Sequence, residues 1–193
     1  MSVPCPRCGR QYDVTLFQFG RTIHCTCGER VGLQQRLRVE RDAPRFIADA
    51  MLGRLARWLR ILGIDTAYEA DIEDAELVRR ALEEGRVILT CDRPLREEWR
   101  IEDILVLESW AVMEQLRAVV RHFGLQEHIR LFSRCSCCNA LLRAASAQDA
   151  AQGAPEYVLR TSDEFQRCPS CGRVYWEGTH TERIRRTLAD LLP

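Results

Sequence analysis

Two short apolar runs in the middle of the chain each end directly on an aspartate. Residues 46–48 lead into Asp49, and residues 87–91 lead into Asp92. Each run is too short for a helix and carries β-branched residues, so each predicts a buried strand. Ligands of parallel α/β sheets bind at the carboxyl ends of the strands, so both carboxylates are predicted to reach one crevice.

The segment 45–130 as a whole alternates strand-like and helix-like patterns. Further strands are predicted at 65–68 and 104–107, and helices at 52–62, 75–84, 95–99 and 113–123. Asp74 is expected to be the N-cap of the second helix, and Gly85 is expected to end it. This order of elements predicts an α/β fold in which helices flank a parallel sheet.

Four cysteines in the last third of the chain form two pairs with the Cys-x-x-Cys spacing. They are Cys135, Cys138, Cys168 and Cys171. Two such turns supply four thiolates, which suits a tetrahedral zinc ion in a zinc ribbon, and Gly172 lets the second turn close. Cys137 is left spare by this pairing. Since the protein fills all four positions around such an ion, the predicted site is structural.

The N-terminal segment, residues 1–38, carries a second and less regular set of cysteines. They are Cys5, Cys8, Cys25 and Cys27. The second pair has one intervening residue instead of two, so His24 stays open as a replacement for either of its cysteines. A module of this length has too little core to fold alone, which favours a metal. One or two structural zinc ions are therefore predicted for the chain.

The predicted domains are the zinc-ribbon-like module 1–38, the α/β core 45–130, and the zinc ribbon with a terminal helix, 131–193. A charged linker that ends at Pro44 separates the first two. Within the last domain, the Ala- and Gln-rich stretch 144–155 is expected to be a loop.

Composition excludes several classes of protein. The 28 basic residues balance 28 acidic ones, and every basic residue is an arginine. Without lysine there is no Schiff-base lysine and no P-loop lysine. Neutrality argues against strong nonspecific binding of nucleic acid, but a local arginine face stays open. No apolar run reaches about 18–20 residues, and the first residues do not form a signal peptide, so a cytoplasmic protein without a membrane span is expected.

More acids lie between the two strand-end aspartates, among them Asp71 and Asp74. Carboxylates gathered around Mg²⁺ or Mn²⁺ can generate a metal-bound hydroxide and stabilise the charge on a scissile phosphate. Nearby arginines can bind the substrate backbone through their bidentate fork. The candidates are three arginines at spacing three on the first predicted helix and one beside Asp92: Arg54, Arg57, Arg60 and Arg93.

Four stretches resemble one family, the Mut-seven C-terminal RNases. They are residues 45–63, 85–93, 133–139 and 168–180. The resemblance implies a PIN-like nuclease core with a zinc ribbon fused behind it. The N-terminal cysteine module lies outside the resemblance, and its zinc is inferred from spacing alone.

The resemblance also implies the chemistry: hydrolysis of RNA phosphodiester bonds with Mg²⁺ or Mn²⁺. It makes Asp49 the acid of the first strand and Asp92 the later acid in a Thr-x-Asp motif. Asp71 or Asp74 completes the set, and Asp74 is favoured by the helix pattern that follows it. Cys91 stands where the family often has arginine.

Two other functions stay open at this point. One is a nonenzymatic RNA-binding or adaptor protein with a degenerate PIN-like core, and the other is a DNA-directed or toxin-like PIN nuclease. Retention of both Asp49 and Asp92 favours the ribonuclease. Neither the target RNA, the mode of cutting nor the oligomeric state follows from the sequence.

Overall fold

The computed structural model describes residues 2–33, 44–99 and 101–191. The chain forms two compact units. The first unit contains Met1–Gly53 and Tyr68–Trp110, and the second contains Arg54–Ala67 and Ala111–Pro193. In the described part of the chain, no helix combines the length and apolar character that a membrane crossing requires.

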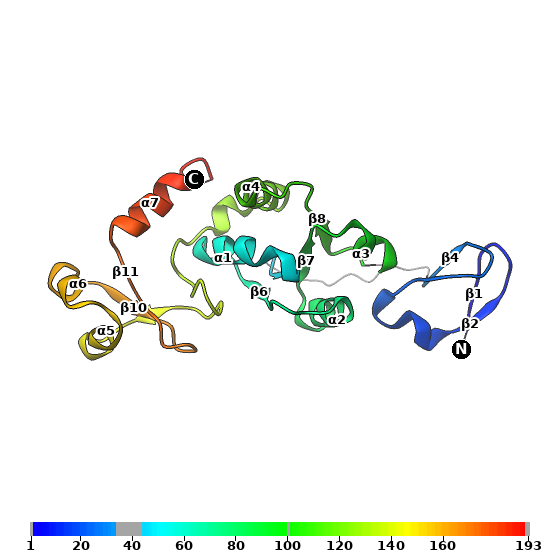
Figure 1. Ribbon diagram of the computed structural model, residues 1–193, viewed down its shortest axis with the longest axis horizontal. Helices are drawn as coiled ribbons and strands as arrows, with labels where there is room; N and C mark the ends of the chain where they lie inside the picture. The colour runs from blue at the N-terminus through cyan, green and yellow to red at the C-terminus, as the bar shows by residue number, and fades with distance from the viewer. Residues whose placement is uncertain (1, 34–43, 100, 192–193) are drawn as a thin grey trace. The chain divides into compact units, whose positions relative to one another are not determined.

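The core contains the parallel sheet that the sequence predicts (Figure 1). Its strands, in the order β6-β5-β7-β8, are Thr66–Tyr68, Phe46–Ala48, Val87–Thr90 and Ile104–Val106. β7 pairs in parallel with β5 on one side and with β8 on the other. Every residue of β5 and β7 is buried, as expected for central strands covered on both faces. The predicted mixed α/β architecture is therefore confirmed.

Two helices of the first unit pack against this sheet. α2 (Asp74–Glu84) contacts β5 and β7, and α3 (Arg93–Glu98) contacts β8 (Figure 1). The prediction that Asp74 caps α2 is wrong: Asp74 is its first residue, and Glu73 holds the N-cap position. The reason is that the Leu77 amide donates to the carbonyl of Glu73, which starts the helix one residue earlier. The side chain of Asp74 is thereby released from capping.

The N-terminal module consists of two small antiparallel ladders joined by a 3-10 segment. Its elements are β1 (Ser2–Pro4), β2 (Gln11–Asp13), η1 (Val14–Gly20), β3 (Ile23–His24) and β4 (Arg30–Val31). Phe17 and Val31 are buried with Cys5 and Cys25 in a small core of their own. So few buried side chains supply little stability, which is the physical reason to expect a metal here.

This module contacts α3 within the first unit. The backbone amide of Thr22 donates to the carbonyl of Glu98 at 2.5 Å, and its hydroxyl donates to the carbonyl of Glu97 at 3.2 Å. The guanidinium of Arg21 lies 5.8 Å from the ring centre of Trp99, which is buried. The module therefore packs against the end of α3, and its η1 segment also contacts α2.

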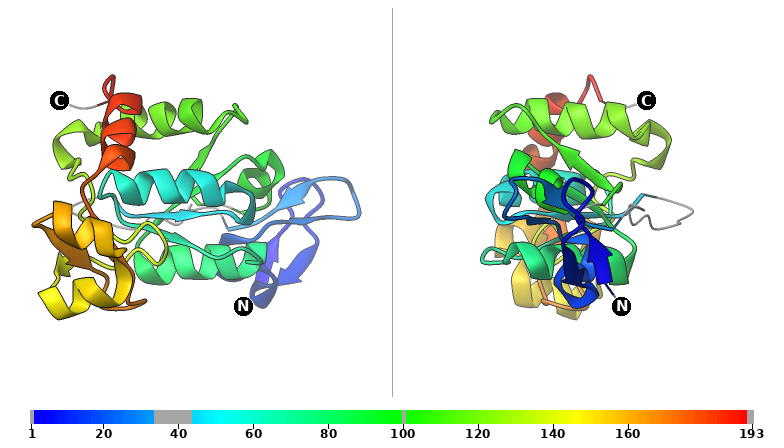
Figure 2. Two further views of the ribbon diagram at one scale, coloured as in Figure 1. Left: turned by 60° about the vertical axis from the view of Figure 1, so that its left-hand side comes forward. Right: turned by 90° about the vertical axis from the view of Figure 1, so that its right-hand side faces the viewer.

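The second unit combines helices of the core with a three-stranded ribbon. Its elements are α1 (Gly53–Ile61), α4 (Val112–His122), η3 (Leu125–His128), β9 (Arg143–Ala144), α5 (Ala147–Gly153), α6 (Glu156–Thr161), β10 (Phe165–Arg167), β11 (Val174–Trp176) and α7 (Thr179–Thr187). The antiparallel ribbon has the order β11-β10-β9, and α5 packs against β10 and β11 (Figure 2).

The expectation of a loop over 144–155 is wrong, because α5 occupies most of it. Ser146 and Asp149 form a capping box: the Asp149 amide donates to Ser146 Oγ at 3.1 Å, and the Ser146 amide donates to Asp149 Oδ2 at 3.2 Å. This box satisfies helix amides that would otherwise lack partners, and alanine favours the helix that follows.

A network of polar side chains joins the loop after α1 to the zinc ribbon. Asn139 donates through Nδ2 to Asp65 at 2.9 Å and accepts from the Thr66 amide at 3.0 Å. The guanidinium of Arg134 pairs with the same Asp65 at 3.3 Å. These bonds explain why α1 belongs to the same compact unit as the ribbon, although many residues separate them in the chain.

Candidate active site and metal centres

One hydroxyl links the carboxylate of Asp49, which follows β5, to the backbone of Asp92, which follows β7. Thr90 Oγ1 donates to Asp49 Oδ2 at 2.5 Å and accepts the backbone amide of Asp92 at 2.8 Å. Thr90 is fully buried, and Asp49 is 6% exposed. The hydroxyl therefore fixes one oxygen of Asp49 and the backbone of Asp92 in the same small region.

Neither aspartate uses its side chain to cap a helix. Asp49 is the N-cap of η2 (Ala50–Leu52) and Asp92 is the N-cap of α3, but neither side chain accepts a capping hydrogen bond. An N-cap aspartate normally accepts an amide of the first turn. Both carboxylates are consequently available for chemistry at the carboxyl end of the sheet.

Asp74 shares the electrostatic field of these two acids. The pKa of its carboxyl group is raised by partial desolvation and, next in size, by the negative charges of Asp49 and Asp92. Glu98 and Glu73 raise the same pKa further. Neighbouring carboxylates disfavour one another's ionisation, and a cation placed among them would relieve this repulsion. The fourth acid considered from the sequence, Asp71, lies exposed in the turn before α2.

The chemistry of this acidic group suits a hard cation that retains water. Carboxylate oxygens are the ligands that Mg²⁺ prefers, and Mg²⁺ is often held by one or two carboxylates while it keeps several waters. Within the described ranges, the groups whose ligand atoms all lie within 4.8 Å of one another are the two sets of cysteines. Asp49, Asp74 and Asp92 do not form such a group among the described residues.

The first cysteine set is the predicted zinc ribbon. Cys135 Sγ lies 3.6 Å from Cys171 Sγ, and Cys138 Sγ lies 3.3 Å from Cys168 Sγ. A tetrahedral ion at about 2.3 Å from each sulfur requires sulfurs about 3.8 Å apart, so this group fits zinc. The amides of Cys138 and Cys171 point at the sulfurs of the cysteines three residues before them, each at 3.4 Å.

Tyr175 contacts one cysteine of this group. Its hydroxyl lies 3.0 Å from Cys135 Sγ. Burial raises the pKa of the Cys135 thiol, but the hydrogen bonds from Tyr175 and from the Cys138 amide lower it to about 6. A thiolate stabilised in this way is the form that binds a metal.

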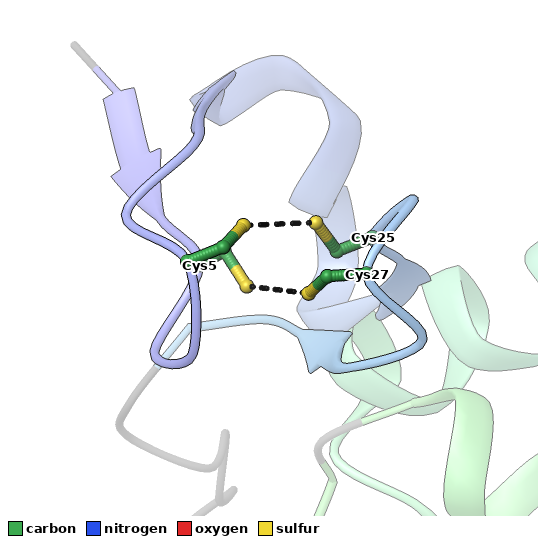
Figure 3. A group of neighbouring side chains, drawn as sticks. Cys5, Cys25 and Cys27 are labelled. Carbon is green, nitrogen blue, oxygen red and sulfur yellow. Dashed lines mark hydrogen bonds between the residues drawn. The ribbon is translucent and has the colours of Figure 1, made fainter.

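The second set lies in the N-terminal module and unites Cys5, Cys8, Cys25 and Cys27. Figure 3 shows the side chains of Cys5, Cys25 and Cys27 pointing toward one another. Cys5 Sγ is 3.6 Å from Cys27 Sγ, and Cys8 Sγ is 3.5 Å from Cys25 Sγ. These separations also fit zinc. His24 is not a member of this group.

The turns of this module explain how a shorter spacing works. After Cys5, the Gly9 amide returns to the Cys5 carbonyl at 2.9 Å, whereas after Cys25 it is the Gly28 amide, one residue sooner, that returns at 2.8 Å. Both glycines have left-handed φ, at +73° and +85°. The tighter turn therefore brings Cys25 and Cys27 into the same group without the usual second spacer.

The four arginines predicted to bind substrate fall into two classes. Arg54, Arg57 and Arg93 are exposed. Arg60 is 5% exposed, and its guanidinium donates to the carbonyls of Thr66 at 2.8 Å and Cys137 at 2.6 Å. These bonds give Arg60 partners other than a substrate phosphate, and they hold the ribbon against the end of α1.

Sequence reasoning did not single out Thr90 or Glu98 as members of the site. The available signal for Thr90 was a lone hydroxyl at the end of an otherwise apolar, fully buried strand, where a polar group needs a partner. For Glu98 no signal was available, since its influence on Asp74 arises from the fold.

Comparison with known proteins places residues of this chain in a known family. Residues 44–188 match the family model described as the Mut7-C RNAse domain. The chain is similar to a human protein named "Exonuclease mut-7 homolog", with 27% identity over 229 residues that cover 77% of this chain and 26% of the relative. The chain thus spans about a quarter of that relative's length. No solved structure matches with statistical significance. Because the family match covers most of the chain, the chain belongs to the Mut7-C RNase domain family.

Proposed function

We propose that the chain is a metal-dependent ribonuclease with a PIN-like core, which hydrolyses RNA phosphodiester bonds with Asp49, Asp74 and Asp92 around Mg²⁺ or Mn²⁺. Family membership supports an RNase-type nuclease that acts on RNA. The observation that carries the mechanism is the hydrogen-bonded link from Asp49 through Thr90 to the backbone of Asp92.

Each side chain has a role in this proposal. Asp49 and Asp92 bind the ion, which supplies positive charge at the scissile phosphate and lowers the pKa of a water. Asp74, whose carboxyl group lies in the electrostatic field of these two acids, accepts the proton of the attacking water. As the water oxygen bonds to phosphorus, the ester P–O bond breaks and the departing oxygen takes a proton from solvent.

The exposed arginines contribute binding. Arg93 follows Asp92 directly, its side chain is 74% exposed, and its contact with Glu108 is long, at 3.9 Å. It is thus available for a nonbridging phosphate oxygen beside the acids. Arg54 and Arg57 are proposed to contact RNA away from the bond that is cut.

The test is cleavage of end-labelled single-stranded RNA by zinc-loaded protein with Mn²⁺ added or withheld. Withholding is preferable to a strong chelator, which would also strip zinc from cysteine sites. Wild type should cleave only with the added ion, whereas Asp49→Asn and Asp92→Asn should not cleave. The exposed Glu102→Gln serves as the matched control and should retain activity.

Absence of cleavage by wild type with either ion would favour the nonenzymatic adaptor. Cleavage at the wild-type rate by either aspartate variant would show instead that these acids are not the catalytic site.

A further inference from the structure

We propose that a cavity in the second unit binds a segment of single-stranded RNA. Its volume is about 610 Å³, within the range of ligand-binding clefts. α1, α6, β11 and the first turn of α7 contribute to its walls. All its lining residues belong to the second unit, whereas the proposed catalytic acids belong to the first. That the polymer is RNA rests on the proposed function; the site itself rests on the following observations.

The charge of the lining is of one sign. Arginines and a histidine line the cavity, namely Arg57, Arg134, Arg173 and His180, and its described lining contains no acid. The chain as a whole has equal numbers of acidic and basic residues, so this sorting is local. A second cavity of about 450 Å³ in the same unit is lined by Asp163, Glu164 and Glu177 together with one arginine. The first cavity is therefore the one suited to an anion.

Two of these cations are available to a ligand. Arg134 is already paired with Asp65. Arg57 and Arg173 are exposed, and neither side chain forms an ion pair or hydrogen bond with any residue in the described ranges. Two unpaired guanidinium groups at one cavity present bidentate donors to phosphate oxygens.

Aromatic rings occupy the same lining. Tyr157 of α6 is 69% exposed, although an aromatic side chain on a soluble protein usually covers apolar surface. Trp176 and Tyr175 of β11 are partly buried beside it. The hydrogen bond from Tyr175 to Cys135 ties this wall to the zinc centre, which gives the ribbon a role in shaping the cavity.

Unpaired cations beside one exposed ring and two partly buried rings suit a ligand with phosphates and planar bases. Single strands meet this requirement because their bases are free to stack on aromatic side chains, whereas the bases of a duplex are already stacked and paired. The cavity would thus hold RNA independently of the acids that cut it.

The test is fluorescence anisotropy with labelled hexauridylate and the full-length, zinc-loaded protein. All variants carry Asp49→Asn so that the probe stays intact. Replacing Arg57 and Arg173 together by alanine should weaken binding about tenfold or more and reduce the slope of log affinity against log salt by about 1.4, since each phosphate contact on a single strand contributes about 0.7.

A matched double variant removes the same charge elsewhere in the same unit. Arg121 and Arg143 are exposed and do not line the cavity, so their replacement by alanine should change affinity less than about twofold. Tyr157→Ala should weaken binding about fivefold or more through lost stacking. Zinc content and melting temperature confirm that each variant is folded.

Two results would overturn the inference: unchanged binding by the Arg57/Arg173 variant, or an equal loss by the Arg121/Arg143 variant. Either is distinguishable from failure of the proposed function. Wild type that binds the probe through Arg57 and Arg173 but never cleaves RNA would contradict the nuclease and leave the cavity assigned. Cleavage of RNA by wild type, together with normal binding by the Arg57/Arg173 variant, would support the nuclease and contradict the assignment of the cavity.

Discussion

Thr90 Oγ1 lies 2.5 Å from Asp49 Oδ2, and the same hydroxyl accepts the backbone amide of Asp92. A buried carboxylate without a hydrogen-bond donor is costly, so this contact offsets part of the cost of burying Asp49, which is 6% exposed. It also fixes the direction in which the second oxygen of Asp49 is presented.

Replacement of Thr90 by valine keeps the shape of the side chain and removes the hydroxyl. The free energy of unfolding should fall by about 1–3 kcal/mol, because Asp49 loses its donor in a buried site. RNA cleavage should fall about tenfold or more, since a displaced catalytic group is strongly penalised. Thr90→Ser, which keeps the donor, should retain most of the stability and most of the cleavage activity. Denaturant melts and cleavage rates measure the two effects, and equal behaviour of the two variants would refute the positioning role.

Cleavage rates should distinguish Asp74 from Asp71 as the third acid of the site. Asp74→Asn should lower the cleavage rate about 100-fold or more, as expected for loss of a general base. Asp71→Asn should stay within about threefold of wild type, because Asp71 is not among the charges that chiefly raise the pKa of Asp74, whereas Asp49 and Asp92 are. A larger loss from Asp71→Asn than from Asp74→Asn would exchange their roles.

The raised pKa of Asp74 predicts a pH dependence of stability in protein free of Mg²⁺ and Mn²⁺. A carboxyl group whose pKa is higher in the folded than in the unfolded state binds more protons when folded. Its contribution is present below the ordinary pKa of 3.8 and is lost as the pH rises through the raised value. Wild type should therefore lose stability relative to Asp74→Asn as the pH rises from about 4 to about 7. Melting curves of both proteins across this range test the sign.

Zinc content distinguishes ligands from neighbours. Wild type purified without added metal should contain two zinc ions per chain, one for each group of four cysteines. Cys138→Ser should lose one, while the adjacent Cys137→Ser, which lies outside the group, should keep both. Likewise Cys8→Ser should lose one and His24→Ala none. Elemental analysis provides the count, and zinc loss from the Cys137 or His24 variant would require a different set of ligands.

Substitutions of Arg60 and of Arg57 should differ in how much they lower the free energy of unfolding. Arg60→Ala leaves the carbonyls of Thr66 and Cys137 without their charged donor, so the free energy of unfolding should fall by about 1.5–3 kcal/mol. Arg57→Ala should change it by no more than about 0.5 kcal/mol, as is usual at exposed positions. Equal stabilities would mean that the buried bridge is not formed in solution.

Deletion of residues 1–38 should leave a folded core with a lower melting temperature. The core keeps its own sheet, but removal of Arg21 and Thr22 uncovers Trp99 and two carbonyl groups of α3. The truncated protein should still melt cooperatively and bind one zinc ion. Insolubility or a gradual melt would show instead that the module is an integral part of the core.

The sequence by itself was sufficient for the features that depend on local pattern. Short β-branched runs predicted β5 and β7, because such side chains fit a buried strand, and the aspartates after them were correctly located at the strand ends. Cysteine spacing predicted both metal groups, because two sulfurs on one tight turn are brought together by local backbone geometry alone.

Tertiary structure decided the features that depend on a partner distant in the chain. Arg57 and Arg60 are three residues apart on one helix, yet only Arg60 is buried, because the carbonyl of Cys137 meets its guanidinium. In the same way, the charges of Asp49, Asp92 and Glu98 reach Asp74 only after folding. Helical spacing specifies a face but not what covers it, and electrostatic interaction depends on separation in space. For that reason the sequence could propose the acids and arginines, whereas only the fold decided which charges influence one another and which side chains are buried.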